Sequence, residues 1–309
     1  MVVNFNTREH LSECLAAVPL SGDVRVVVVD NASSDGSGTM VRECYPRAEL
    51  IANRRNVGYG AAANQGVATC TSEHVLVMNS DVVIGPGTLE ALGQYLERHP
   101  RVALVGPRIT QVDGRLQSSC NPFPTLIPTL LAESGVGPLL RYVPAVREHY
   151  LPTSSHARPR RVPWVMGAAM AMRRAAFDAI GGFDPSFFMY FEEVDLCYRL
   201  VAAGWEVHFA PVTNVVHVGA ASTRRYRSDM AVQALASRLH FYRRHYPGPR
   251  VAALVLLIDA IVLLRLVLGP VRIGLSRSEQ RRARLADELV AWRRALLGEW
   301  LRSGYAMRH

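Results

Sequence analysis

Three carboxylates lie within four positions of one another in the stretch FFMYFEEVDLCYRL, residues 187–200. They are Glu192, Glu193 and Asp195, with four aromatic residues before them and an apolar run after them. Clustered carboxylates raise one another's proton affinity, which makes one of them a better general base. If a helix begins near Glu192, Glu192 and Asp195 share a face and Glu193 points about 100° away. An acidic helix N-terminus, favoured by the helix dipole, would account for one or two of the three.

A second group of polar residues follows apolar runs that read as strands. Their positions are Asn4 and Asn6 after the first run, Asp30 after VVVV, and Asn79, Ser80 and Asp81 after VLVM. In a parallel sheet these strand ends meet at one rim, where ligands bind. Asp81 could hold a divalent cation there together with phosphate oxygens of a ligand, or could simply cap a turn. Asp30 could accept a hydrogen bond from a nucleobase or ribose.

Two further signals are ambiguous when taken alone. Gly58-x-Gly60-x-x-Ala63, with Asp81 following, imitates a dinucleotide-binding fingerprint. That fingerprint needs a strand running straight into the glycines, whereas residues 53–56 intervene here. An apolar run also ends in His217, but a lone histidine is more often structural than a metal ligand.

The elements that must position these residues alternate between strands and helices through the first half. Continuous apolar runs, typical of parallel strands buried on both faces, lie at Val26–Val29, Val75–Met78 and Val102–Val105. Helical stretches lie between them, around Glu9–Ala17, Thr39–Cys44, Gly60–Ala68 and Leu89–Arg98. The pattern predicts an α/β fold with a mostly parallel central sheet. Residues 118–163, rich in Pro and Ser, predict a long irregular connection.

Composition narrows the class of protein. The 309 residues are 49% hydrophobic and 20% charged, as in folded proteins. All 35 basic residues are arginine, so Schiff-base lysine chemistry and a Walker-type lysine are excluded. The five cysteines form no C-x-x-C pair, which argues against a disulfide framework or a zinc site and for a reducing compartment. No signal peptide is expected, because the chain opens on VVNFN, which reads as a strand; whether residues precede it is left open.

The C-terminal part has a different character. From Val251 the sequence is strongly apolar as far as residue 271 but contains Asp259 and Arg265. A helix lying on the membrane is favoured over a buried or dimer-interface helix and over a true span, since a central Asp costs roughly 2.5–3.5 kcal/mol on insertion. Apolar residues then recur at helical spacing, at Leu285, Leu289, Trp292, Leu296 and Trp300. Ten arginines against four carboxylates after residue 264 suggest an anionic membrane surface more than nucleic acid.

Seven motifs, in order, resemble the family 2 glycosyltransferases, most closely the rhamnosyltransferase-type branch that builds bacterial cell-envelope glycans. They are VVNFNTREHLSECL, VVVVDNASSDGS, NRRNVGYGAAANQG, VLVMNSDVVIGPG, VPWVMGAAMAMRR, GGFDPSFFMYFEEVDLCYRL and VVHVGAAS. The resemblance implies a GT-A fold over residues 1–247. Its nucleotide-binding half covers about 1–117 and its acceptor-binding half about 118–247, followed by a helical extension over 248–309.

The resemblance also assigns roles by position. Nucleotide-sugar binding is implied for Asp30, for Asn56, Gly58 and Asn64, and for the strand-end residues Asn4, Asn6, Asn79 and Ser80. Asp81 matches the last position of the family's metal-binding Asp-x-Asp motif. In this branch the first position of the motif is Asn, which is Asn79 in this chain. His217 matches a histidine that supports the metal, expected to be Mg²⁺ or Mn²⁺, or the diphosphate. Trp164, Gly167 and Ala168 match a segment near the transferred sugar and acceptor.

The catalytic base is inferred in the same way. The branch usually reads Glu-Asp where this chain has Glu192-Glu193, and the second member is the inferred base. Glu193 is therefore the first choice. Its side chain is one methylene longer than Asp, so Glu192 and Asp195 stay open as alternatives.

The expected function is inverting, metal-dependent transfer of a sugar in cell-envelope polysaccharide synthesis. The best-supported reaction moves L-rhamnose from dTDP-rhamnose to a lipid-linked or glycan acceptor. It would take place in the cytoplasm on the inner face of the cell membrane. Alternatives are another dTDP- or UDP-sugar, a silent glycosyltransferase-like scaffold, and a nicotinamide-dependent oxidoreductase. No nucleic-acid partner is expected; a homodimer, the exact acceptor and the metal are left open.

Overall fold

The computed structural model describes residues 1–19, 24–125, 156–219 and 227–275, with scattered positions between 278 and 293. They fall into two compact units that are interleaved along the chain. The first comprises 1–123, 150–186 and 192–222, and the second comprises 124–149, 187–191 and 223–309. Most of the connection expected over 118–163 lies outside the described residues. The expected division of the chain at residue 247 stays a prediction.

The first unit is built on a mixed sheet. Its strands, in spatial order, are β3 (Glu49–Ala52), β2 (Val27–Asp30), β1 (Val2–Asn4), β4 (His74–Asn79), β11 (Ala169–Arg173), β6 (Val102–Thr110), β12 (Glu206–His217) and β5 (Val82–Ile84). Short strand β7 (Leu116–Gln117) pairs with β6, β9 (Arg160–Arg161) pairs with β12, and β8 (Cys120–Asn121) pairs with β10 (Trp164–Val165) in a separate sheet. Strands β1 to β4 pair in parallel, and so do β6 and β12, which confirms the mostly parallel sheet. Strand β11 lies antiparallel between β4 and β6, a feature that the sequence pattern does not predict.

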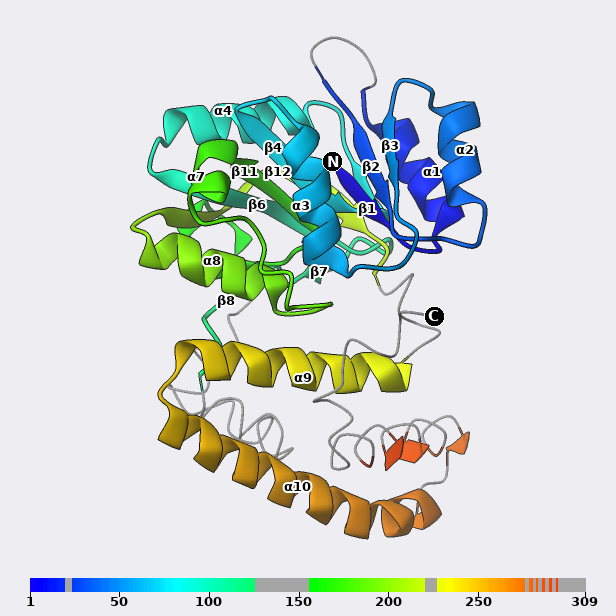
Figure 1. The fold of residues 1–309 in the computed structure, drawn as a ribbon, viewed down its shortest axis with the longest axis vertical. Helices are drawn as coiled ribbons and strands as arrows, with labels where there is room; N and C mark the ends of the chain where they lie inside the picture. The colour runs from blue at the N-terminus through cyan, green and yellow to red at the C-terminus, as the bar shows by residue number, and fades with distance from the viewer. Residues whose placement is uncertain are drawn as a thin grey trace. The chain divides into compact units, whose positions relative to one another are not determined.

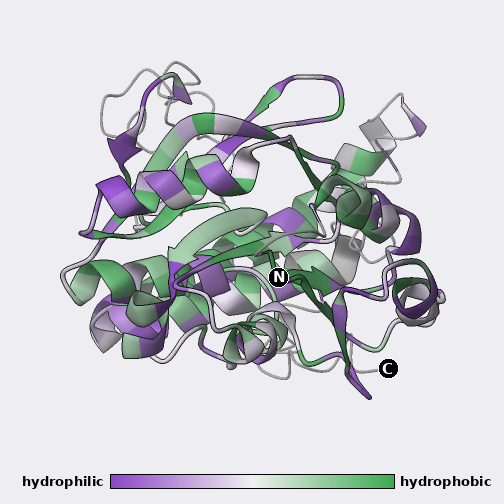
Figure 2. Ribbon diagram, turned by 90° about the horizontal axis from the view of Figure 1, so that it is seen from above, coloured by the Kyte–Doolittle hydropathy of each residue, from purple (hydrophilic) through white to green (hydrophobic). Residues whose placement is uncertain are grey.

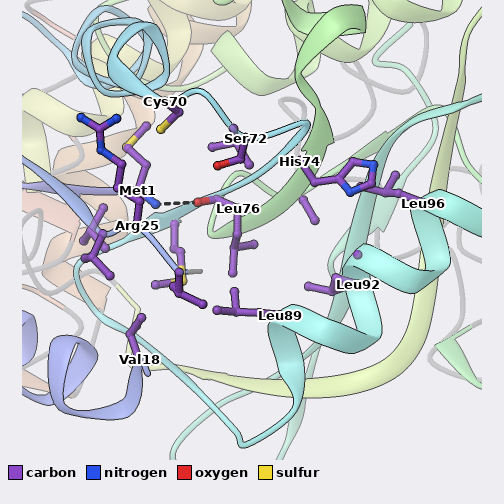
Figure 3. Close-up of a pocket in the computed structure, with 17 residues that line it drawn as sticks. Met1, Val18, Arg25, Cys70, Ser72, His74, Leu76, Leu89, Leu92 and Leu96 are labelled. Atoms are coloured by element: carbon purple, nitrogen blue, oxygen red, sulfur yellow. Dashed lines mark hydrogen bonds between the residues drawn. The ribbon is translucent and has the colours of Figure 1, made fainter. Parts of the chain in front are cut away.

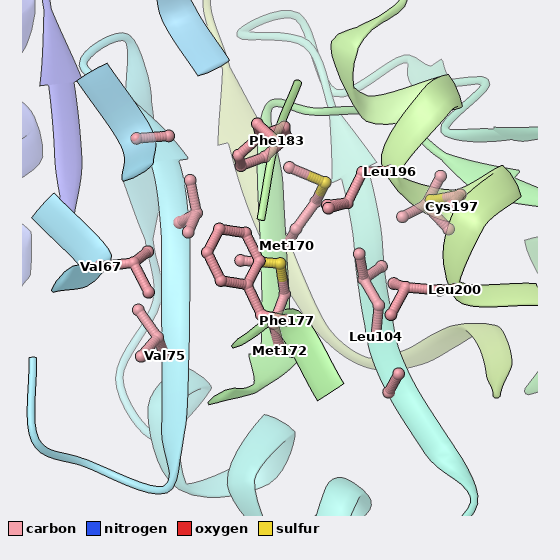
Figure 4. Packing of buried hydrophobic residues seen from close by; sticks show 14 of the residues in the cluster. Val67, Val75, Leu104, Met170, Met172, Phe177, Phe183, Leu196, Cys197 and Leu200 are labelled. Carbon is pink, nitrogen blue, oxygen red and sulfur yellow. The ribbon is translucent and has the colours of Figure 1, made fainter. Parts of the chain in front are cut away.

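Helices cover both faces of this sheet (Figure 1). They are α1 (Arg8–Ala17), α2 (Ser37–Cys44), α3 (Tyr59–Thr69), α4 (Thr88–Arg98), α7 (Arg174–Ala179) and α8 (Glu192–Ala202). The strands are mainly hydrophobic while the helices carry both kinds of residue, as Figure 2 shows. Alternate residues of β2 therefore serve two cores, with Val28 on the α1 and α2 side and Val29 on the α3 and α8 side. The second of these cores includes Phe177, Leu196 and Met170 (Figure 4).

The second unit contains two helices that lie side by side, α9 (Arg227–His245) and α10 (Gly248–Leu275) (Figure 1). Among the described residues, Gly248–Val271 is the one helical stretch long and apolar enough to cross a membrane, and 22% of its most apolar window is buried. Its exposed large side chains are Leu256, Leu257, Leu263, Leu264, Val267, Leu268 and Val271. Trp292, Leu296 and Trp300, expected in a basic amphipathic helix, lie outside the described residues.

A five-residue segment, 187–191, belongs to the second unit although the residues on either side belong to the first. Its aromatic rings pack on rings of α9, and the hydroxyl of Ser237 donates to the carbonyl of Met189 over 2.7 Å. Tyr190 and Phe191 have φ of 66° and 67°, the left-handed region that costs a non-glycine residue about 1–3 kcal/mol. Contacts with α9 hold this conformation in place.

Candidate active site

The polar residues expected at the carboxyl ends of the strands do meet at one rim of the sheet. Asn4 lies opposite Asp30 in the β1–β2 register, and Asn4 Nδ2 donates to Asp30 Oδ1 over 2.8 Å. Thr7 links this pair to the next strand end, because its hydroxyl donates to Asn4 Oδ1 and lies 2.7 Å from Ser80 Oγ. All four side chains are buried. Asp30 is thus fixed in place by hydrogen bonds that hold its carboxylate at the rim.

Asn6 and Asn31 shape the two loops beside Asp30. Asn6, in the left-handed region at φ 53°, accepts the Ser34 amide on its side-chain oxygen over 2.8 Å. Asn31 Nδ2 donates to the carbonyl of Gly58, and Asn56 Oδ1 accepts the amide of Gly58. Gly58 has φ 88° at the start of α3, a conformation suited to glycine. Gly58 lies in a turn that residues 53–57 separate from β3. The conformation of this turn accounts for the glycine, so a dinucleotide-binding fingerprint is not needed to explain it.

Asp81 and His217 come together because β5 pairs antiparallel with the end of β12. In that register His217 lies opposite Val82, the residue after Asp81. His217 Nε2 is 3.3 Å from Asp81 Oδ1, and each side chain is 9% exposed. His217 Nδ1 lies 2.9 Å from Gln117 Oε1, which orients the ring. Within the described parts of the chain, no three or more His, Cys, Asp or Glu residues are grouped as a metal site.

The start of β11 connects this rim to the carboxylates of α8. The amide of Asn79 donates to the carbonyl of Ala168 over 3.0 Å. The carbonyl of the preceding residue, Gly167, accepts the Tyr59 hydroxyl over 3.0 Å. A Cβ added to Gly167 would lie 3.5 Å from the Cβ of Glu193. One backbone stretch therefore contacts both Asn79 at the rim and Glu193, the expected base.

The two adjacent glutamates at the start of α8 differ in burial. Glu192 is buried at 7% exposure, whereas Glu193 is partly exposed. Burial, and then the charge of Glu193, raises the pKa of Glu192 well above its usual range. Burial, with added effects of these carboxylates and of Asp81, likewise raises the pKa of Tyr59 well above its usual value. Both shifts favour the uncharged forms, a carboxylic acid at Glu192 and a phenol at Tyr59.

Asp195 is engaged elsewhere. Its fully buried carboxylate lies 2.7 Å from Arg199 Nε. The same guanidinium donates to the carbonyls of Ile180 and Gly182. Through Arg199, these contacts attach α8 to the loop that precedes it. The Asp195 carboxylate therefore orients the guanidinium that stabilises this part of the fold.

Asn64 and Trp164 also make mainly structural contacts. Asn64 exchanges two hydrogen bonds with the backbone of Phe183, at 2.8 and 2.9 Å. Trp164 Nε1 donates to the carbonyl of Pro122 over 2.8 Å. Both contacts join segments that flank the rim.

Three residues of this arrangement are not singled out by sequence patterns: Thr7, Tyr59 and Gln117. Tyr59 lies within the NVGYG motif, which is the only signal that could have found it. Thr7 and Gln117 acquire their partners through strand pairing, which periodicity does not reveal.

A cavity of about 200 Å³ lies at the other end of the strands, near their amino ends (Figure 3). Apolar side chains such as Val26 and Leu92 line most of it, and the amino group of Met1 donates to the carbonyl of Leu76 over 2.9 Å. No candidate residue described above borders this cavity. The candidate active site is therefore the opposite rim.

Comparison with known sequences agrees with this geometry. Residues 1–246 match the family model described as glycosyltransferase-like family 2. The N-acetylglucosaminyl-diphospho-decaprenol L-rhamnosyltransferase of Mycobacterium tuberculosis is 32% identical over 303 residues, covering 93% of this chain and 97% of the relative.

Solved structures share the fold. The mannosyltransferase PcManGT from Pyrobaculum calidifontis, in complex with GDP-Man and Mn²⁺, aligns with a TM-score of 0.54 at 17% identity over 96% of this chain and 86% of that one. GalNAc-T7 with UDP, GalNAc and Mn²⁺ aligns with a TM-score of 0.50 at 14% identity over 70% of this chain and 42% of that one. At these identities the likeness shows a GT-A type fold and nothing about substrates.

Proposed function

The chain belongs to the family 2 glycosyltransferases, and we propose that it transfers L-rhamnose from dTDP-rhamnose to a lipid-linked acceptor. The choice of sugar and acceptor follows the full-length similarity to the mycobacterial rhamnosyltransferase. The geometric observation that carries the proposal is the Gly167–Ala168 stretch. It contacts Asn79 on the nucleotide rim and Glu193 on α8, so donor and acceptor groups can be presented to each other there.

In the proposed reaction Glu193 accepts the proton of the acceptor hydroxyl. The hydroxyl oxygen forms a bond to the anomeric carbon as the bond from that carbon to the diphosphate breaks on the opposite face. The nucleoside diphosphate leaves with the bonding electrons, and the sugar is inverted. The raised pKa of Glu192 disfavours a second charge beside the base, and the Tyr59 hydroxyl donates to the carbonyl of Gly167, the residue against which Glu193 packs.

The residues present fit a divalent metal, which we place at Asp81 and His217. When His217 Nδ1 donates to Gln117, Nε2 presents a lone pair to the Asp81 carboxylate 3.3 Å away, an arrangement that a cation stabilises. Two protein ligands are enough for Mg²⁺ or Mn²⁺ when phosphate oxygens and water complete the shell. The bound metal would supply positive charge to the departing diphosphate. Asn79 would contribute at most an amide oxygen.

A donor screen tests the reaction. With Mn²⁺ or Mg²⁺ present, we expect dTDP-rhamnose to be turned over in preference to UDP- and other dTDP-sugars, measured as released nucleoside diphosphate. If another sugar were preferred, the proposed donor would be wrong but the chain would still act as a glycosyltransferase. Absence of any turnover, including slow donor hydrolysis, would favour a silent scaffold, and thermal stabilisation by NAD(H) alone would favour an oxidoreductase.

We also propose that α10 lies on the inner face of the cell membrane with its exposed apolar row in the lipid. The row is contiguous with basic residues, which anionic headgroups attract. The chain should sediment with anionic vesicles at low salt, and Leu264→Glu should weaken this several-fold. Val112→Glu, at an equally exposed apolar position of the first unit, should leave it unchanged. No binding to vesicles, with a dimer at micromolar concentration, would make the row a dimer interface instead.

A further inference from the structure

An open groove of about 460 Å³ runs between the end of α9 and the first turns of α10. Its volume is in the range of small-molecule sites, about 300–1,000 Å³. The residues that line it are Arg243, Gly248, Val251, Ala252, Val255 and Leu256. The wall is thus apolar except for one guanidinium.

We propose that this groove binds the prenyl diphosphate portion of the acceptor lipid, with the diphosphate at Arg243 and the prenyl chain along α10. This inference rests on the proposed lipid-linked acceptor. Such a lipid joins a strongly anionic group to a long apolar chain. The groove offers the complementary pair in the same order, a cation followed by apolar side chains.

The charge around the groove supports an anionic ligand. From Met230 to Ile258 the sequence carries four arginines and no carboxylate. Arg243 and Arg244 are exposed in the last turn of α9, and Arg250 is exposed in the first turn of α10. Guanidinium groups bind phosphate oxygens in a bidentate manner, which suits a diphosphate.

The apolar part of the groove continues beyond it. Leu256, at its edge, is 70% exposed, and the exposed row on α10 extends from there to Val271. Over these residues the helix rises about 1.5 Å per residue, so the row follows a long path for an extended chain. Burying a prenyl chain on it would be favourable in proportion to the apolar area covered.

The experiment measures binding of a long polyprenyl diphosphate to the full chain in a fixed concentration of detergent micelles. Arg243→Gln should weaken binding about tenfold, the effect of losing one charge-assisted contact. Leu256→Gln should weaken it several-fold. Both replaced side chains are exposed, and thermal melting of each variant checks that the fold is kept.

Two matched controls separate the groove from general effects. Val112→Gln changes an exposed apolar residue of the first unit, and Arg98→Gln changes an exposed arginine of the first unit. Both should bind within twofold of the unaltered chain. Polyprenol without phosphate should compete poorly if the diphosphate contact is specific.

Equal binding by Arg243→Gln, or equal losses for Val112→Gln and Leu256→Gln, would overturn the groove assignment. The outcome is separate from that of the donor screen. Sugar transfer with unaffected groove variants would leave the proposed function standing without this site. Prenyl diphosphate binding that depends on Arg243, with no sugar transfer by any donor, would leave the site standing without the function.

Discussion

Replacing Glu193 with Gln is expected to lower sugar transfer about 10²–10⁴-fold, the usual contribution of a general base. Donor binding should stay nearly unchanged, because in the proposed mechanism this side chain acts on the acceptor hydroxyl and not on the donor. Glu193 is the more exposed member of the pair and lies against Gly167, next to the Tyr59 hydroxyl. Initial rates of nucleoside diphosphate release, with calorimetry for donor binding, check both parts.

Glu192→Gln is the matched control. Because burial raises the pKa of Glu192 and favours its protonated form, the neutral amide resembles that form, and transfer should stay within about threefold. Unaltered turnover in Glu193→Gln would exclude Glu193 as the base. If the losses were reversed between the two variants, the base would be Glu192.

Replacing Asp81 with Asn is expected to remove the metal-dependent part of donor binding and to reduce transfer roughly 100-fold or more, since stabilisation of the leaving diphosphate by several kcal/mol is lost. Asn keeps the size of the side chain and the backbone contact of Asp81 with Val218. Donor binding is measured with Mn²⁺ and again with a chelator. The unaltered chain should show a large difference between the two conditions, and the variant should show little.

Asp30→Asn separates the metal from the nucleotide. Asp30 lies on the same rim but is held by Asn4 and Ser33, away from the Asp81–His217 pair in the hydrogen-bond network. Its replacement should weaken donor binding equally with and without metal. Equal binding by the unaltered chain in both conditions would refute a metal role for Asp81.

The meeting of polar side chains at the strand ends was predictable from the sequence, because apolar runs mark the buried strands and helical stretches lie between them. Buried parallel strands read as continuous apolar runs, so the first polar residue after each run marks the rim, as for Asp30 and Asn79. The helix starting at Glu192 was predictable for a similar reason. Its face assignment followed from helical geometry, and Asp195 is fully buried while Glu193 is partly exposed.

Other parts of the site depend on pairings that no local pattern specifies. The AMAMR segment of β11 lacks β-branched residues, and its first four residues are all buried, so periodicity does not tell a strand from a helix there. Its insertion between β4 and β6 nevertheless brings Gly167 to Glu193. Asn64 shows the opposite limit, since a residue expected to line the nucleotide site uses both ends of its side-chain amide to hydrogen-bond the backbone of Phe183.

The segment 187–191 limits where the protein can be cut into shorter pieces. Since these residues pack with α9, the border between the two units runs through the peptide bond that precedes Glu192. A shortened protein ending at residue 222 would keep both glutamates but lose the helix that holds Tyr190 and Phe191 in their left-handed conformation. Those two residues would relax toward ordinary backbone angles and change the direction from which the chain enters α8. We therefore expect a protein cut at residue 222 to lose sugar transfer, so activity should be measured on the undivided chain.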